Sequence, residues 1–266
     1  MKKLAKVYLG LVLLFLYVPI FVLIVFSFNT TKSRTVMTGF TLDWYVKLLH
    51  NEVIMTSLRN TIVIAVIASL ASTILGTLAA IGIHNMNKVP RTVVMNITNF
   101  PVINPEIVTG VSLMLLFVFF AARMNLEFGF WTLLIAHITF DVPYVILNVM
   151  PKLRQMNPYL YEAAQDLGCN PVRAFFKVVL PEIMLGIVSG FLMAFTYSLD
   201  DFIISYFTCG ADTQTLPITI YSMTRRKVSP EINALSTIIF LVVFVCLTVK
   251  LIIDRRHEAK MGKEEV

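Results

Sequence analysis

Four acidic residues lie inside or at the ends of long apolar stretches, where a charged side chain is costly. Asp141 lies in the middle of one stretch, with His137 one helical turn before it. Asp200 and Asp201 come late in another stretch, and Glu106 begins a third. A carboxylate at the centre of a membrane span costs about 2.5–3.5 kcal/mol or more. These residues are therefore candidates for binding or moving an ion.

The same apolar stretches have no lysine or arginine near their centres. Arg59 and Arg123 lie at stretch ends, where their long side chains can reach the membrane interface. The apolar interior is thus selectively negative. A route for phosphate, sulfate or another anion would need basic groups, so the pattern favours a cationic cargo. The alternative for each aspartate taken singly is a hydrogen-bonded structural role.

The residues around the aspartate pair follow a helical spacing. At intervals of three or four residues, one helix face would carry Gly186, Gly190, Ala194, Ser198, Asp201 and Ser205. Small residues at this spacing are typical of helix packing in membranes, which we expect for the glycine half. We expect the polar half to line a route. Because neighbouring helix residues differ by about 100°, Asp200 must point elsewhere than Asp201.

Membrane-spanning helices must position these residues. The chain has 266 residues, of which 57% are hydrophobic and 14% charged, whereas soluble domains have about 25% charged residues. This composition excludes a soluble globule, a disordered chain and a nucleic-acid reader, despite the net charge of +6. Stretches long enough to span a bilayer cover residues 8–28, 58–83, 102–122, 130–150, 183–207 and 233–253. We expect an all-α integral membrane protein with one transmembrane domain over residues 1–266 and its core at about 58–253.

Lysine and arginine set the expected orientation. They are more frequent in the loops that lie inside when both termini are placed in the cytoplasm. The first apolar stretch is too long for a signal peptide and is followed by no small-x-small cleavage site, so we expect it to be retained. The three cysteines are scattered without a metal-binding or disulfide spacing.

The only substantial inner segment is the loop at about residues 151–182. Segments 159–167 and 172–180 are typical of short amphipathic helices. Gly168 suits the C-terminal cap of the first helix, and Leu180-Pro181 is expected to stop the second. Such an element favours docking to a soluble partner, and the alternative is an interfacial helix without one.

This loop carries a sequence signature. It reads Glu162-Ala163-Ala164, three residues, Gly168, nine residues, Val178, one residue and Leu180-Pro181. The pattern resembles the EAA loop of ABC importer permeases, the MetI-like transmembrane family, with Val178 where isoleucine is usual. The resemblance implies that the loop couples the permease to an ATPase, through Glu162, Ala163, Ala164 and Gly168.

Further motifs extend the resemblance over nearly the whole chain. They lie at residues 29–31, 39–45, 137–140, 198–202, 216–223 and 228–234, and they are similar to those of spermidine/putrescine ABC importer permeases. This implies a multi-pass permease of the bacterial cytoplasmic membrane that imports polyamines. Its implied partners are the lipid bilayer, a second non-identical permease, two copies of an ATP-binding subunit and an extracellular or periplasmic polyamine-binding protein.

The resemblance also implies a set of residues along the cargo route: Trp44, Glu106, Ser198, Asp200 and Asp201. Asp141 departs from the related permeases, which have apolar residues at its position. We keep Asp141 as a route candidate because of its position inside a span.

The chain has no Gly-x-x-x-x-Gly-Lys-Ser/Thr phosphate cradle. We therefore expect ATP and Mg to be used by the partner ATPase, with no cofactor, metal or catalytic residue in this chain. One alternative is an ABC permease for another cation such as iron. Others are a secondary transporter driven by an ion gradient and a membrane-embedded enzyme, for which His137 with Asp141 is a thin basis.

Overall fold

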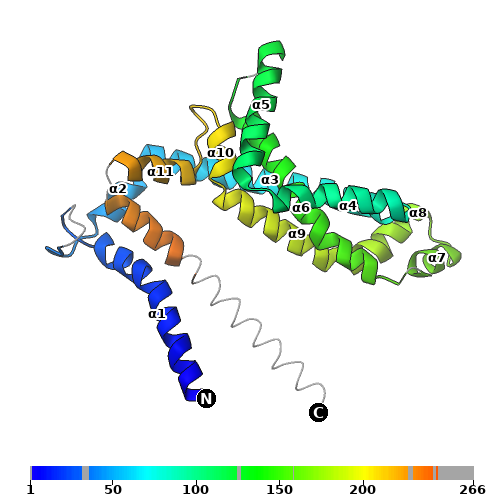
Figure 1. The fold of residues 1–266 in the computed structure, drawn as a ribbon, viewed down its shortest axis with the longest axis horizontal. Helices are drawn as coiled ribbons and strands as arrows, with labels where there is room; N and C mark the ends of the chain where they lie inside the picture. Colours follow the sequence, from blue (N-terminus) through cyan, green and yellow to red (C-terminus); the bar gives the residue numbers. More distant parts are fainter. Residues whose placement is uncertain are drawn as a thin grey trace. The chain divides into compact units, whose positions relative to one another are not determined.

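The computed structural model describes residues 2–31, 36–124, 127–157, 159–226, 230–241 and 244. Within them, five helices are long and apolar enough to cross a membrane (Figure 1). They are α1 (Lys2–Ser27), α3 (Glu52–His84), α5 (Glu106–Met124), α6 (Phe130–Gln155) and a continuous helix, Pro171–Asp200, that ends with α9 (Leu180–Asp200). The expected all-α membrane fold is confirmed. Of the expected sixth span, helix Pro230–Leu241 and Phe244 are described, and the rest lies outside the described residues.

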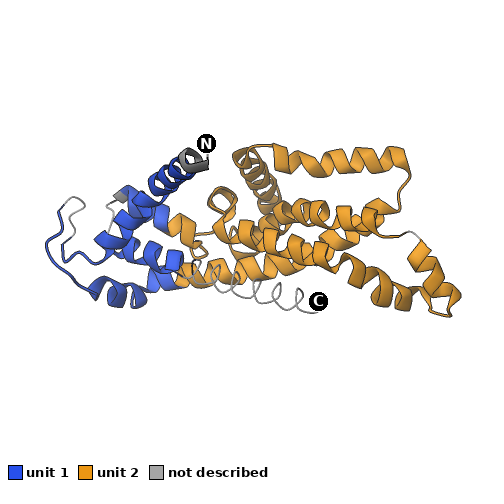
Figure 2. Ribbon diagram, turned by 90° about the horizontal axis from the view of Figure 1, so that it is seen from below, with its two compact units in different colours: residues 1–55, 220–266 blue, residues 56–219 orange. Residues whose placement is uncertain are grey.

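The chain divides into two compact units, residues 1–55 with 220–266 and residues 56–219 (Figure 2). The first unit contains α1, α2 (Asp43–Leu49) and helix Pro230–Leu241. Asn29 holds the loop between α1 and α2 together: its side-chain amide donates to the Val36 carbonyl at 2.9 Å, and its Oδ1 accepts the Thr38 backbone N–H at 2.9 Å. The described side chains of α1 are apolar on every side and largely exposed, as suits a membrane span.

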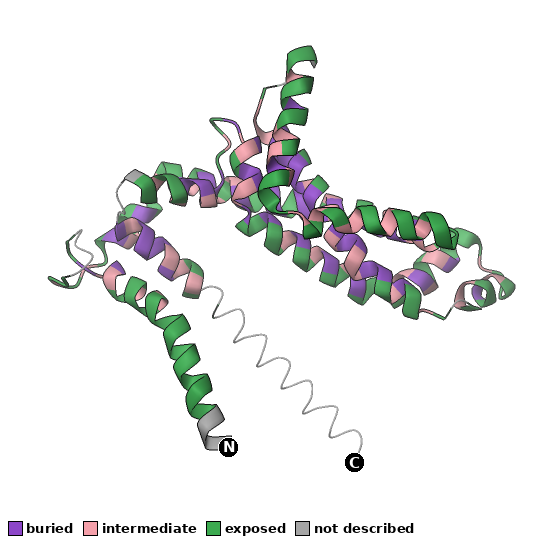
Figure 3. Ribbon diagram, viewed as in Figure 1, coloured by how far each residue is buried: buried purple, intermediate pink, exposed green. Residues whose placement is uncertain are grey.

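The second unit is built around α6, which has the largest buried share among the described membrane-length helices (Figure 3). A Cβ on Gly186 of α9 would lie 2.9 Å from the Asn148 carbonyl oxygen, and one on Gly190 would lie 3.2 Å from the Cα of Val145. Gly76 of α3 approaches the same Val145 side chain. A Cβ on Gly76 would lie 2.7 Å from the Cβ of Val145. A Cβ would clash at Gly186 and Gly76 and would be unusually close at Gly190, so the glycine half of the stripe is a packing seam, as predicted.

The third expected span is broken at its start. A helix that we did not predict, α4 (Lys88–Ile103), runs through Pro101 alongside α6 and has no buried residue. It ends before Asn104, which is extended (φ −71°, ψ 144°), and α5 begins at Glu106 after Pro105. The residue before a proline avoids the helical region, so Pro105 interrupts the span as expected, whereas Pro101 is accommodated inside α4.

The fifth expected span, 183–207, is not one helix. It ends at Asp200, Asp201 is extended (φ −64°, ψ 123°), and a new short helix, α10 (Ile203–Thr208), follows. Beyond α10 the chain turns into α11 (Leu216–Arg226). The prediction of a continuous helix was wrong because hydropathy does not detect a helix start inside an apolar run.

The loop at about residues 151–182, which we expect on the inner side and call the inner loop, contains α7 (Tyr159–Asp166), α8 (Pro171–Ala174) and a π-helical turn, Phe175–Val179. Gly168 has φ +88° after α7, which confirms its capping role. The expected stop at Leu180-Pro181 is wrong, since the helix continues from α8 into α9. A proline lacks the N–H that would bond four residues back, and the wider π turn just before Pro181 accommodates that loss.

Candidate functional site

Asp201 occupies the break between α9 and α10. Its Oδ1 accepts the backbone N–H of Ile204 at 3.1 Å, and its Oδ2 accepts that of Ser205 at 2.6 Å. These amides belong to the first turn of α10, where no acceptor exists within the helix itself. The aspartate therefore starts α10, and two amide dipoles stabilise its buried negative charge.

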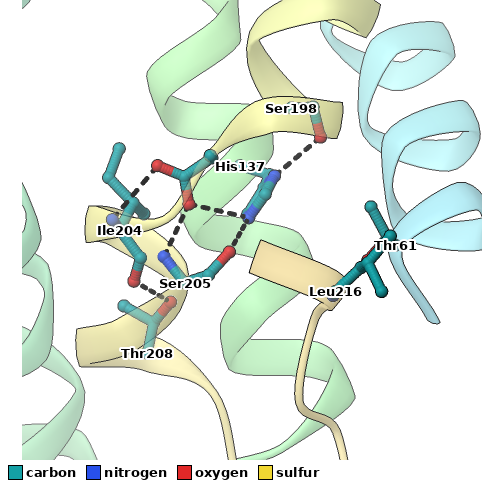
Figure 4. A network of polar contacts seen from close by, with 8 residues as sticks. Thr61, His137, Ser198, Ile204, Ser205, Thr208 and Leu216 are labelled. Atoms are coloured by element: carbon teal, nitrogen blue, oxygen red, sulfur yellow. Dashed lines mark hydrogen bonds and ion pairs between the residues drawn. The ribbon is translucent and has the colours of Figure 1, made fainter. Parts of the chain in front are cut away.

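His137 of α6 connects both sides of this break (Figure 4). Its Nδ1 lies 2.6 Å from Ser198 Oγ on α9, and its Nε2 lies 3.0 Å from Ser205 Oγ on α10. The same Nε2 is 3.5 Å from Asp201 Oδ2. All four side chains are buried. The polar half of the sequence stripe thus faces α6, and the two serines meet on one histidine.

Further hydroxyl contacts surround this cluster. Thr132 of α6 donates to the Thr208 carbonyl of α10 at 2.9 Å. Thr61 of α3 accepts the Leu216 backbone N–H at 2.7 Å, at the start of α11 (Figure 4). These contacts fix the segment after the break to α6 and α3, so the broken helix is held at both ends.

Ser198, His137 and Asp201 are also the residue types of a hydrolase triad, but their geometry does not support that chemistry. His137 Nε2, which a triad aspartate would hold, lies closer to Ser205 Oγ at 3.0 Å than to Asp201 Oδ2 at 3.5 Å, and the Ser198 hydroxyl is buried. The nearby Cys209 is no better nucleophile, because burial raises the pKa of its thiol. The cluster is arranged to hold helices together.

Asp141 lies one turn beyond His137 on α6, and its surroundings differ from those of Asp201. It is fully buried, and neither of its carboxyl oxygens has a hydrogen-bond partner among the described residues. Buried polar groups are nearly always paired, so this orphaned carboxyl is exceptional.

Glu106 and Asp200 are exposed, in contrast to the buried aspartates. Glu106 begins α5 four residues before Gly110, whose missing Cβ would lie 3.5 Å from the Ile203 carbonyl oxygen of α10. The start of α5 therefore lies about one turn from a contact with the segment that follows Asp200 and Asp201. Asp200 and Asp201 differ in exposure, as their spacing predicted.

Trp44 belongs to the first unit and is buried there at the start of α2. Its indole N–H donates to the Asn29 carbonyl at 2.7 Å, and Lys47 Nζ lies 4.6 Å from its ring centroid. Its ring already contacts a cation from its own helix. The other five expected route residues all lie in the second unit.

The inner loop presents part of its signature outward. Glu162 and Ala163 of α7 are exposed, whereas Ala164 is buried against the loop. The Asn170 side chain accepts the Arg173 backbone N–H at 2.8 Å and caps α8, with Pro171 in the first turn. This elbow gives α7 a defined position with one face free.

The sequence did not single out His137 as the centre of the cluster. The sequence contained one signal for this cluster, which was the presence of polar residues on two apolar helix faces. His137 and Asp141 share one face, and Ser198 ends the glycine stripe on the other. Without knowing that α6 is the helix opposite that stripe, the pairing of His137 with Ser198 could not be deduced.

Comparison with known families places most of this chain in one of them. Residues 72–263 match the family described as binding-protein-dependent transport system inner membrane component. The matched region includes the inner loop, α6, α9 and the broken segment at Asp201.

Individual relatives match over most of their length. The putrescine transport system permease protein PotI of Escherichia coli strain K12 is 40% identical over 229 residues, which cover 85% of this chain and 81% of PotI. The spermidine/putrescine transport system permease protein PotC of Haemophilus influenzae is 33% identical over 254 residues, covering 96% of this chain and 97% of that protein.

One solved structure has the same fold. It is a chain from the crystal structure of a bacterial ABC transporter involved in the import of the acidic polysaccharide alginate. The TM-score is 0.70 at 16% sequence identity, with 96% of this chain and 95% of that chain covered. At this identity the likeness concerns the fold and not the cargo.

Proposed function

This chain belongs to the family of binding-protein-dependent transport system inner membrane components, and on that premise we propose that it is the membrane-spanning permease subunit of an ATP-driven importer for polyamines such as spermidine and putrescine. The observation that carries the proposal is the 33–40% identity to putrescine and spermidine/putrescine permeases over most of both chains. It is a transport subunit and not an enzyme.

The charges of the second unit support a polyamine as cargo. A polyamine is a flexible chain of protonated amines separated by short methylene linkers. Separated carboxylates on apolar walls suit such a molecule, because each can pair with one ammonium while the linkers lie against apolar side chains. Asp200 and Glu106 are exposed carboxylates near the broken segment, so we assign them the first contacts with cargo.

Ser198 and Asp201 have a positioning role in this proposal. Their side chains are engaged with His137 and with the amides of α10. They hold the break that brings Asp200 to the surface of the unit. Trp44 is engaged within the first unit, and a cargo contact by its ring would require Lys47 to move aside.

The inner loop is the proposed contact with the ATPase. Besides Glu162 and Ala163, the exposed side chains of this loop include Leu167, which is 88% exposed, and Tyr159 and Val172. Large apolar side chains exposed on a short loop favour a protein partner. The complete importer would contain a second permease, two ATP-binding subunits that use ATP and Mg, and an external polyamine-binding protein.

Uptake by the reconstituted complex tests the cargo. Proteoliposomes that contain this chain, its permease partner, the ATPase and the binding protein should accumulate radiolabelled spermidine or putrescine when ATP is enclosed on the ATPase side. Unlabelled polyamine should compete, whereas ferric iron should not. Uptake of iron without uptake of either polyamine would replace this proposal with the other cationic cargo.

A further inference from the structure

Two buried aspartates lie close together in the second unit, and only one is compensated. Asp201 accepts two backbone N–H groups and lies 3.5 Å from His137 Nε2. Asp141 is completely buried, and neither Oδ1 nor Oδ2 has a partner among the described residues. The two aspartates therefore have opposite environments. Asp201 faces His137 of α6, and Asp141 lies one helical turn beyond His137 on the same helix.

The contacts of α6 define what faces Asp141. The antiparallel register of α9 pairs Gly190 with Val145 and Ser198 with His137, which places Ala194 opposite Asp141. Gly76 of α3 meets Val142 and Val145 on the same face of α6. Asp141 thus lies one turn before a junction of α3, α6 and α9 that is packed by small residues.

No cation compensates Asp141 within the described residues. Asp141 interacts electrostatically with Asp201 and with Tyr144, and His137 lies one turn away on the same helix. Tyr197 and Glu106 lie near Tyr144. Residues 69–76 of α3 contribute hydroxyl groups and apolar side chains only. Ser69 and Ser72 donate these hydroxyls to carbonyls of their own helix.

An ionised carboxylate in this junction would be buried without a hydrogen bond or a counter-ion. Asp201, which carries its charge on two amides, would repel it further. A buried acid in such surroundings takes up a proton and becomes neutral. Pairs of acids whose environments differ in this way commonly have different protonation states and different roles.

We propose that Asp141 is a proton-loaded carboxyl in this closed junction, and that it exchanges its proton for an ammonium group of the cargo when the junction opens during transport. The exchange is balanced: the carboxylic acid loses H⁺ to water, and the resulting carboxylate pairs with one R–NH₃⁺ group. Closing the junction reverses it, because the acid regains a proton as the ammonium leaves. The exchange step rests on the proposed polyamine function, whereas the protonated resting state does not.

The resting state can be tested by infrared spectroscopy of the purified complex at neutral pH. The carbonyl stretch of a protonated carboxyl should be present in the wild type, shift on transfer to D₂O, and be lost in Asp141→Asn. Asp201→Asn is the matched control and should retain the band. Asp141→Leu places an apolar side chain in the same junction and should also lose the carbonyl band. This variant replaces Asp141→Asn in the test if the asparagine variant fails to assemble. A band that survives both Asp141 variants, or one that disappears only in Asp201→Asn, overturns the proposal.

A second measurement tests the exchange. When spermidine and a non-hydrolysable ATP analogue are added in weak buffer, the wild type should lose the Asp141 band and release about one more proton per complex than Asp141→Asn. An unchanged band and equal proton release in a complex that transports polyamine would exclude the exchange. If the complex transports no polyamine, the proposed function fails, and the resting band still decides whether Asp141 is protonated.

Discussion

His137 uses both ring nitrogens to join segments that are 61 and 68 residues away in the chain. Ser198 and Ser205 lie on opposite sides of the helix break, and each makes its interhelical contact through this one imidazole. A buried group in a membrane interior has no water as an alternative partner. The histidine is therefore a positioning residue for the break, and Asp200 next to the break depends on it.

Replacing His137 by alanine should destabilise the complex. Two buried serine hydroxyls lose their interhelical contact and a cavity forms, so we expect a loss of about 1–3 kcal/mol. The midpoint of thermal unfolding of the purified complex measures it. Thr139→Ala on the exposed face of the same helix removes only a local hydroxyl bond to Ile135 and should leave the midpoint unchanged. Equal midpoints for both variants would show that the histidine is not structural.

Asp200 is the acidic residue whose role in cargo binding can be separated from folding, because its side chain is exposed. We expect Asp200→Asn to assemble normally and to lower polyamine uptake at subsaturating cargo by about tenfold, which is the loss of one charge-assisted contact of roughly 1.4 kcal/mol. Radiolabelled uptake measures it. Asp212→Asn, an exposed aspartate in the loop after α10, is the control and should retain full uptake. Wild-type uptake in Asp200→Asn would remove this residue from the route.

At the scale of elements, glycines that look alike in the sequence differ in their effect on helix packing. Gly186 and Gly82 both lie in long apolar helices. A Cβ on Gly186 would meet the Asn148 carbonyl oxygen at 2.9 Å, whereas one on Gly82 meets nothing within 4 Å. Only the first is required by packing.

Gly186→Ala should push α9 away from α6. A methyl group against backbone cannot be relieved by a rotamer change, so we expect a loss of about 1–3 kcal/mol. Gly82→Ala should be neutral or stabilising, since alanine favours a helix by about 1 kcal/mol. Detergent thermal shift assays on the two variants give the comparison. The packing argument fails if Gly82→Ala is the more damaging change.

The elbow of the inner loop depends on Gly168, whose φ of +88° is unfavourable for other residues. Gly168→Ala should cost about 1–2 kcal/mol locally and misplace α7. We expect the permease to remain folded while cargo-stimulated ATP hydrolysis by the complex falls. Asparagine tolerates positive φ, so Gly168→Asn should retain more of this stimulation. If both variants hydrolyse ATP as the wild type does, the loop does not couple the two subunits.

At the scale of the whole molecule, the chain belongs to the family of binding-protein-dependent transport system inner membrane components, and its fold is that of a chain from a bacterial ABC transporter. The chain has no phosphate cradle of its own. In the proposed importer a partner ATPase supplies the energy, and the exposed face of α7 is the surface we assign to that contact.

Polyamine uptake should therefore depend on ATP hydrolysis in a partner subunit. A partner ATPase with its catalytic glutamate replaced should abolish uptake, because the conformational cycle cannot be completed. An ionophore that dissipates ion gradients in proteoliposomes with enclosed ATP should leave uptake intact. The reverse result, in which uptake survives loss of hydrolysis and disappears with the gradient, would identify a secondary transporter.

The sequence alone determined the membrane fold, the family and the signature of the inner loop. Long apolar stretches have no other stable environment, and the Glu162–Gly168 signature is local, so both can be read without knowing any long-range contact. The prolines at 101 and 105 also predicted a break, which the structure places at Pro105 while α4 runs through Pro101. A proline acts on its own neighbours in the chain, so such a break can be read locally.

Only the tertiary structure showed that the buried aspartates have different surroundings. From the sequence, Asp141 and Asp201 are both aspartates inside apolar stretches. The structure gives Asp201 two amides and a nearby imidazole, and it leaves Asp141 without a partner among the described residues. The physical reason is that the free energy of a buried charge depends on the groups within a few ångströms, and here those groups come from helices that are far apart in the chain.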